Sequence, residues 1–325
     1  MTNTVVSRIW KAVSKQKAVL AILGMMALML FFRTNFYTRS NWMNLLKSAA
    51  ILEIVAFGVS VAVICGGCDL SVGGTLSLGG IVAVLLINGG QPIWIAFIAA
   101  IASGALVGFV NGFLVVHQRT EPFIITLGMG MLLKGVAQQL TNAHPLTSKV
   151  LPFMKISNMT FFPNFLGGIP SLVVYMAALF VLFFCLMRFT SFGRNCYAIG
   201  GNYEVAKNSG IRVVGIKWTA FVISGATAAL AGVLLASQMN GGSSVYGDTT
   251  GMTVNCGVVV GGTSFAGGVG GILESFIGLF VMQLLNNCMN MLAIDGFYQK
   301  LLTGILIVLI IGFDCFFRMR KRQRT

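Results

Sequence analysis

The chain has 325 residues, of which 56% are hydrophobic and only 9% are charged. With a mean hydropathy of +0.87, it has too few polar residues to cover a soluble globule of this length, which predicts a membrane protein. The formal net charge of +14 is not carried by any basic soluble domain. It therefore gives no support to nucleic-acid binding and instead suits orientation in a lipid bilayer.

Long, unbroken apolar runs favour transmembrane helices over a β-barrel, whose strands would alternate polar and apolar residues. A bilayer core of roughly 30 Å takes about 20 helical residues. We therefore expect an all-α, polytopic bundle of about ten spans, some short and one, glycine-rich, broken or only dipping into the membrane. The expected spans are 18–32, 48–65, 75–87, 93–116, 122–140, 169–187, 218–238, 251–262 (the glycine-rich one), 268–286 and 299–317.

Basic residues near span ends resist translocation, so they mark the cytoplasmic side of the membrane. Most of the Lys and Arg residues lie near the two chain ends and in one internal stretch. This pattern predicts a single transmembrane domain with both termini in the cytoplasm. Its expected parts outside the membrane are a cytoplasmic tail at 1–17, a periplasmic loop at 141–170, a cytoplasmic loop at 188–217 and a basic cytoplasmic tail at 318–325.

Motifs for catalysis and metal binding are missing from the sequence. There is no GxxxxGK[ST] phosphate loop, so ATP-driven work would have to come from a partner chain. His117 and His144 are the only histidines and are not paired as metal ligands, and the CxxC formed by Cys65 and Cys68 has no second ligand pair. We therefore expect no enzyme activity, no metal and no cofactor.

A glycine-rich stretch, GGCDLSVGG from Gly66 to Gly74, separates two apolar runs. Asp69 or Ser71 can cap the helix that resumes after it. A carboxylate at membrane depth is costly, so Asp69 is expected to face a helix N-terminus, a cavity or the cytoplasmic boundary. The two interpretations are a capped helix start and a polar gate in a pathway.

Other polar groups also fall in or near the predicted spans. Lys134, like Asp69, Glu53 and Glu274, is either part of a structural pair or cap, or a member of a proton or ion relay. Three amides, Asn255, Asn286 and Asn287, either hydrogen-bond between helices or contact a polar solute.

Two glycine-rich strings are similar to each other. VGGTSFAGG, from Val260 to Gly268, matches VGGTLSLGG, from Val72 to Gly80, at six of nine positions. Both are expected at the cytoplasmic edge of the membrane. The match predicts a parallel internal repeat of the kind that transporter folds use.

The basic loop contains the signals of a short helix from Tyr203 to Ser209. Asn202 suits the N-cap, Glu204 suits the first turn, and Gly210 suits the left-handed position after the helix, with Ile211 placed to contact Ala206. A helix of this length is unstable alone in water. It must pack either on the membrane surface or in the cleft of a soluble partner.

Five motifs in order resemble those of the membrane permeases of bacterial ATP-binding-cassette sugar importers, in the ribose, xylose, galactose and allose branch. The resemblance extends from about residue 40 to residue 317. The motifs are GGCDLSVGG at 66–74, EPFIITLGMGMLLKGVA at 121–137, FGRNCYAIGGNYEVAKNSGI at 192–211, SGATAALAGVLLAS at 224–237, and VVVGGTSFAGGVGG at 258–271 followed by LLNN at 284–287.

The resemblance implies an inner-membrane subunit that imports a monosaccharide and pairs with a second permease, either an identical or a different chain. A cytoplasmic ATPase and a periplasmic sugar-binding protein would be its partners. The alternatives are an ion-coupled secondary transporter and an importer of the same family that carries a non-sugar polar solute. The residues expected to couple to the ATPase are Asn202, Tyr203, Glu204, Ala206, Lys207 and Gly210. Those expected along the pathway or at its gate are Asp69, Ser71, Lys134, Asn255, Asn286 and Asn287.

The chain departs from the family pattern in three places. The segment from Gly251 to Gly257 lacks the two acids that the family usually has there, Cys68 replaces a usual isoleucine, and Glu121 stands where proline or a small residue is common. If the two missing acids contribute to solute passage or to the ATPase contact, we expect a difference in substrate or coupling.

Overall fold

The computed structural model describes residues 17–32, 35–118, 120–161, 168–305, 308 and 312. The chain divides into two compact units, one formed by Met1–Leu45 with Phe280–Thr325 and the other by Leu46–Leu279. Most of the predicted tail at 1–17, the tail at 318–325 and the second half of the predicted span 299–317 lie outside the described residues.

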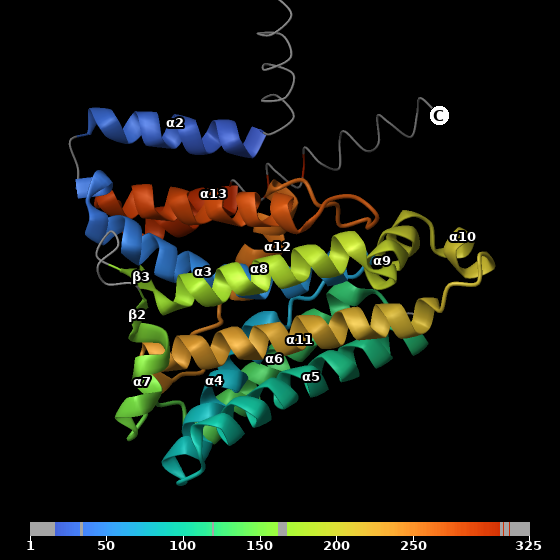
Figure 1. The fold of residues 1–325 in the computed structure, drawn as a ribbon, viewed down its shortest axis with the longest axis horizontal. Coiled ribbons are helices and arrows are strands. Elements are labelled where there is room, and N and C mark those ends of the chain that lie inside the picture. Colours follow the sequence, from blue (N-terminus) through green and yellow to red (C-terminus); the bar gives the residue numbers. More distant parts are fainter. Residues whose placement is uncertain are drawn as a thin grey trace, which may run out of the picture. The chain divides into compact units, whose positions relative to one another are not determined.

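The larger unit is built from long apolar helices, which run roughly alongside one another (Figure 1). Six of the described helices are long and apolar enough to cross a membrane, and three shorter apolar helices accompany them. The six are α3 (Arg39–Ile64), α5 (Ile93–His117), α6 (Pro122–Thr141), α8 (Ser171–Phe189), α11 (Val213–Gln238) and α13 (Ile272–Met291). The shorter ones are the apolar part of α2 (Lys17–Phe31), α4 (Val72–Asn88) and α12 (Thr250–Val260). Nine of the predicted spans therefore correspond to apolar helices.

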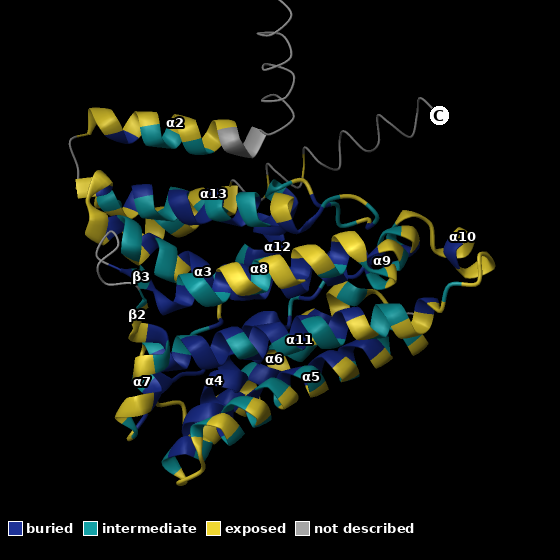
Figure 2. Ribbon diagram, in the orientation of Figure 1, coloured by how far each residue is buried: buried dark blue, intermediate teal, exposed yellow. Residues whose placement is uncertain are grey.

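Helix α11 lies at the centre of this unit and packs against α4 and α5. Small residues allow the close approach: a Cβ on Gly104 or Gly108 of α5 would collide with backbone oxygens of α11. This spacing of four residues is the small-xxx-small pattern that lets membrane helices pack backbone to backbone. The outward faces of α5, α6 and α8 carry most of the exposed residues of these helices, while α4 and α11 are largely buried (Figure 2). Exposed apolar faces on long helices suit contact with lipid or with another membrane subunit.

The smaller unit has its own apolar core. It contains α2, the 3₁₀ helix η1 (Asn35–Tyr37), the start of α3 and most of α13. Asn41 and Asn287 exchange two side-chain hydrogen bonds within this unit, at 3.0 and 2.8 Å. The buried hydrophobic residues of the core are Met29, Phe36, Leu45, Leu284 and Cys288.

Residues 141–161 and 168–170 of the predicted periplasmic loop at 141–170 are among those that the structure describes. They include α7 (Leu151–Asn158) and the antiparallel pair of β2 (Thr160–Phe161) with β3 (Ile169–Pro170), and β1 (Leu146–Thr147), which pairs with β4 (Gly241–Gly242) after α11. Ser157 of α7 donates to the carbonyl of Leu234 at 2.8 Å, which fixes α7 to the end of α11. Figure 1 shows α7 at one end of the long helices and α10 (Tyr203–Asn208) at the other.

The two glycine-rich strings on which the predicted internal repeat rests do not share a local structure. Residues 72–80 form the first half of α4, whereas residues 261–268 form the turns that follow α12. Gly262, Gly267 and Gly268 have positive φ values, of 110°, 86° and 71°. The two strings match because both need glycine, one for close helix packing and the other for left-handed turns.

Candidate translocation site

The loop between α3 and α4, residues 65–71, carries a fully buried carboxylate, Asp69. Its Oδ1 accepts hydrogen bonds from the backbone N–H of Ser71 at 3.0 Å and from the Ser71 hydroxyl at 2.6 Å. Its Oδ2 accepts from the hydroxyl of Ser224, in the middle of α11, at 2.7 Å. Asp69 therefore satisfies an amide at the start of α4 and at the same time ties α11 to the loop.

Three further helices hold the same loop through single polar side chains. Asn111 of α5 donates to the Ser71 hydroxyl at 2.8 Å. Thr126 of α6 accepts from a loop N–H at 3.0 Å, and Asn255 of α12 donates to the Asp69 carbonyl at 2.8 Å. Because four helices from distant parts of the chain bond to one loop, the loop is the polar anchor of the larger unit.

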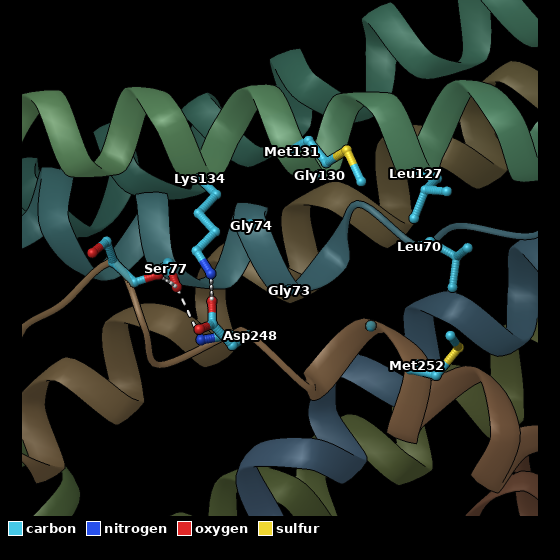
Figure 3. Close-up of a pocket in the computed structure, with 13 residues that line it drawn as sticks. Leu70, Gly73, Gly74, Ser77, Leu127, Gly130, Met131, Lys134, Asp248 and Met252 are labelled. Carbon is cyan, nitrogen blue, oxygen red and sulfur yellow. Dashed lines mark hydrogen bonds and ion pairs between the residues drawn. The ribbon is translucent and has the colours of Figure 1, made fainter. Parts of the chain in front are cut away.

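A pocket of about 720 Å³ with its open side included lies next to this loop, between α4, α6 and the start of α12. Lys134 extends from α6 toward Asp248 and pairs with it, with Nζ 2.8 Å from Oδ1 (Figure 3). The Ser77 hydroxyl of α4 accepts from the backbone N–H of Gly247 at 3.0 Å. The lining residues are Leu70, Gly73, Gly74, Ser77, Leu127, Gly130, Met131, Lys134, Ser244, Gly247, Asp248, Gly251 and Met252.

Two glycines that line the pocket, Gly73 and Gly247, are in direct backbone contact. A Cβ on Gly73 would collide with the carbonyl oxygen of Gly247, and a Cβ on Gly247 would collide with the Gly73 carbonyl. The backbone of α4 and the loop before α12 therefore touch directly at this point, which only glycine allows. Any side chain there would push these two segments apart.

The pocket offers hydroxyl groups, backbone groups and one ion pair. Lys134 and Asp248 neutralise each other, and their side chains are 44% and 39% exposed. Both can hydrogen-bond a ligand without giving the pocket a net charge. The arrangement suits a small, neutral, polar solute.

The structure brings together four of the six residues predicted for the pathway. Asp69 and Ser71 belong to the anchored loop, Asn255 of α12 bonds to it, and Lys134 lines the adjacent pocket. Asn286 and Asn287 belong to the smaller unit, where Asn287 bonds to Asn41.

The ionisable residues that would form an ion relay lie in separate environments. Asp69 bonds to serines, Lys134 pairs with Asp248, and Glu274 is exposed in the first turn of α13. Glu53 is fully buried in α3, and its carboxyl oxygens have no hydrogen-bond partner in the described part of the chain. No chain of hydrogen bonds joins these four groups among the described residues.

The sequence reasoning missed several residues of the site, namely Ser77, Asn111, Thr126, Ser224 and Asp248. Four of them, all except Asp248, are polar residues inside apolar helices, and polar groups within a membrane span need a partner. That signal was present in the sequence, but it does not say which partner each residue finds.

The short helix predicted from Tyr203 to Ser209 is confirmed as α10. The Asn202 side chain accepts from the Val205 N–H at 3.1 Å, as an N-cap does. Gly210 has a φ of 81°, and the N–H of Ile211 bonds to the Ala206 carbonyl at 3.2 Å, which is the expected C-terminal closure. The residues predicted to couple to an ATPase are exposed except for Ala206, which is buried at 3% exposure.

A second open cavity, of about 970 Å³, lies beside α10. Charged groups from three parts of the chain face it: Glu121 before α6, Glu204 and Lys207 of α10, and Lys217 near the start of α11. Tyr203 of α10 also lines the cavity. Through Glu204 and Lys207, α10 presents side chains of both charges at this end of the unit.

A family of transport permeases and several known permeases match this sequence. Residues 41–311 match the family described as branched-chain amino acid transport system, permease component. The ribose import permease protein of Escherichia coli K12 is 33% identical over 304 residues, covering 92% of this chain and 93% of the relative. The ribose import permease protein of Bacillus subtilis 168 is also 33% identical, over 86% of each chain. An L-arabinose ABC transporter permease protein of Azospirillum brasilense is 30% identical over 97% of this chain and 91% of the relative.

No solved structure matches the chain. The family match covers most of the sequence and includes the anchored loop, the pocket and α10. The chain is therefore a member of this family of multi-pass membrane transport permeases.

Proposed function

We propose that this protein is the permease subunit of a bacterial ATP-binding-cassette importer that carries a monosaccharide across the inner membrane. The names of its relatives, which refer to ribose import and L-arabinose transport, support this proposal. The chain contributes the pathway, and a separate ATPase subunit supplies the energy. About ten spans with both termini in the cytoplasm complete the arrangement, with a second permease at its side.

The pocket at Lys134 and Asp248 is the observation that carries the proposal. A monosaccharide is neutral and rich in hydroxyl groups, so it needs donors and acceptors rather than net charge. The paired ions are half exposed and supply both, and the Ser77 hydroxyl and the glycine backbone line the same pocket. Asp69, Ser71 and Asn255 act behind the pocket by holding the loop in position.

In this proposal, energy enters at α10, which docks in the cleft of the ATPase. The helix has a defined cap at each end, and most of its side chains are free to contact a partner. The loop at 141–170, whose α7 lies at the opposite end of the long helices, receives the periplasmic binding protein. Movement of α10 then alternates access to the pocket from the two sides.

Uptake in proteoliposomes tests the proposal. The permease is reconstituted with its ATPase, and the binding protein and a radiolabelled solute are added outside. We expect ATP-dependent uptake of ribose or L-arabinose and none of leucine. Leucine uptake without sugar uptake would replace the monosaccharide with the solute class in the family's description. Uptake by the permease alone under an ion gradient would instead establish a secondary transporter.

A pair of glycine variants tests the role of α10. Gly210→Val places a branched residue at a φ of 81° and should unfold the end of the helix. Gly201→Val adds the same side chain in open space at the end of α9 (Ser191–Gly201). We expect Gly210→Val to abolish sugar-stimulated ATP hydrolysis while Gly201→Val keeps it. Equal activity in the two variants would contradict the coupling role.

A further inference from the structure

A third cavity lies away from the pocket and from α10, and the proposed function does not use it. It has a volume of about 1030 Å³ with its open side included, and it lies between the end of α8, α9 and the start of α13. All of its lining residues belong to the larger unit. We call it the arginine cavity; its lining residues are Phe184, Met187, Arg188, Arg194, Tyr197 and 270–274.

Two guanidinium groups give the arginine cavity its charge. Arg188 is in the last turn of α8 and Arg194 is in α9, and both are exposed. Arg194 donates only a long hydrogen bond, 3.4 Å, to the Phe189 carbonyl. In the described part of the chain, neither arginine has a carboxylate within ion-pair distance. Both are therefore available to an anion from outside the chain.

The single carboxylate of the cavity faces its own helix. Glu274 is in the first turn of α13, and a Cβ on Gly271 would collide with its Oε2. The carboxylate thus lies over the N-terminal backbone of α13, where the helix dipole favours it. One acid against two arginines leaves the arginine cavity with a positive charge.

Tyr197 fixes the walls of the cavity. Its hydroxyl donates to the carbonyl of Gly270 at 2.9 Å, which joins α9 to the start of α13. Burial and the nearby Glu274 raise the pKa of the Tyr197 hydroxyl, while Arg188 lowers it. Tyr197 remains a neutral donor at physiological pH, so this link is present when a ligand binds.

The wall on the other side is apolar and belongs to a membrane-spanning helix. Phe184 of α8 and Leu273 of α13, which line the cavity, are 37% and 41% exposed. Val181 and Leu182, outside the lining but on the same helix as Phe184, are each 59% exposed. On a helix of this hydropathy, such side chains suit contact with lipid chains. The arginines follow directly after them, as expected where a span leaves the hydrocarbon and enters the headgroup layer.

We propose that the arginine cavity binds the phosphate headgroup of an anionic phospholipid of the cytoplasmic leaflet. Arg188 and Arg194 hold the phosphate, and the acyl chains lie along the exposed face of α8 and Leu273. The inference goes beyond the proposed function and rests on it only for the cytoplasmic placement of α9. As a consequence, anionic lipid stabilises the position of α9, which directly precedes α10.

Native mass spectrometry of the intact permease tests this directly. The protein is titrated with phosphatidylglycerol and with phosphatidylcholine of the same acyl chains, because only the first has a net negative charge. We expect phosphatidylglycerol to bind on the order of tenfold more tightly. The double variant Arg188→Gln with Arg194→Gln should lose this preference. Equal binding of both lipids by the unmodified protein would overturn the proposal.

Charge-matched variants keep the test decisive. Lys207→Gln with Arg212→Gln removes the same charge from the same loop and should keep the preference. Arg188→Lys with Arg194→Lys should retain part of it, and Glu274→Gln should strengthen phosphatidylglycerol binding. If the control pair loses the preference as fully as the arginine pair does, the binding is diffuse attraction and the site is refuted.

Two further outcomes distinguish other ligands. Displacement of the lipid by millimolar inorganic phosphate would assign the cavity to a free anion. Loss of ATPase co-purification in the arginine pair, with lipid binding unchanged, would assign the surface to the ATPase. Either result overturns the lipid assignment. Failure of the sugar-uptake experiment leaves these lipid measurements unaffected, since they require neither sugar nor ATP.

Discussion

The buried carboxylate of Asp69 joins the loop at residues 65–71 to α11. It receives three hydrogen bonds, from the Ser71 N–H, the Ser71 hydroxyl and the Ser224 hydroxyl. Asp69→Ala removes the acceptor of all three bonds, whereas Asp69→Asn keeps an oxygen for Ser71 and offers a donor to Ser224. The two variants should therefore differ strongly in stability although they remove the same charge.

The expected magnitudes follow from which donors can find a new partner. After Asp69→Ala, the two hydroxyls can rotate to carbonyls nearby, but the Ser71 N–H is buried without an acceptor, which costs about 1–3 kcal/mol. Hydrogen bonds between membrane helices average about 0.6 kcal/mol and reach about 1.7 kcal/mol, and a bond to a carboxylate lies near the upper end. We therefore expect about 3 kcal/mol for Asp69→Ala and about 1 kcal/mol for Asp69→Asn or Ser224→Ala.

Unfolding of the purified permease in mixed micelles, titrated with sodium dodecyl sulfate and followed by tryptophan fluorescence, measures these differences. The double variant Asp69→Ala with Ser224→Ala should be about 1 kcal/mol more stable than the sum of the single effects predicts, because both changes remove the same bond. If Asp69→Ala and Asp69→Asn destabilise equally, or both by less than about 1 kcal/mol, Asp69 is not the anchor of the loop.

Three further predictions concern the pocket and α10. The double variant Lys134→Gln with Asp248→Asn should change the free energy of unfolding by less than about 1 kcal/mol, because the pair is half exposed. The same variant should lower sugar uptake. Unchanged uptake would show that the pair is not part of the pathway. Gly73→Ala should destabilise the fold by about 1–3 kcal/mol, whereas Gly128→Ala, whose Cβ meets open space, should be neutral in the same titration. Asn202→Ala should weaken the start of α10 by about 1 kcal/mol and reduce sugar-stimulated ATP hydrolysis, while Asn202→Asp should restore it; equal ATPase rates would contradict this.

The sequence determined the features that depend on composition or on neighbouring residues. Apolar runs predicted the helices because a bilayer requires internal backbone bonding over about 20 residues. The ends of α10 followed from Asn202 and Gly210, since a cap contacts the backbone only a few residues away. The five motifs indicated the permease family, and the family match over 41–311 confirms it.

Only the tertiary structure decided which polar residues meet. Ser224 is 155 positions from Asp69, and Lys134 finds its partner in a loop that carried no signal of its own. Two similar glycine strings became a helix and a set of turns, because their surroundings decide whether glycine serves close packing or a left-handed backbone. In a chain this apolar, the helices have similar sequences, so the sequence does not show which helices pack together. The few polar groups acquire partners only when packing brings distant helices within hydrogen-bond distance.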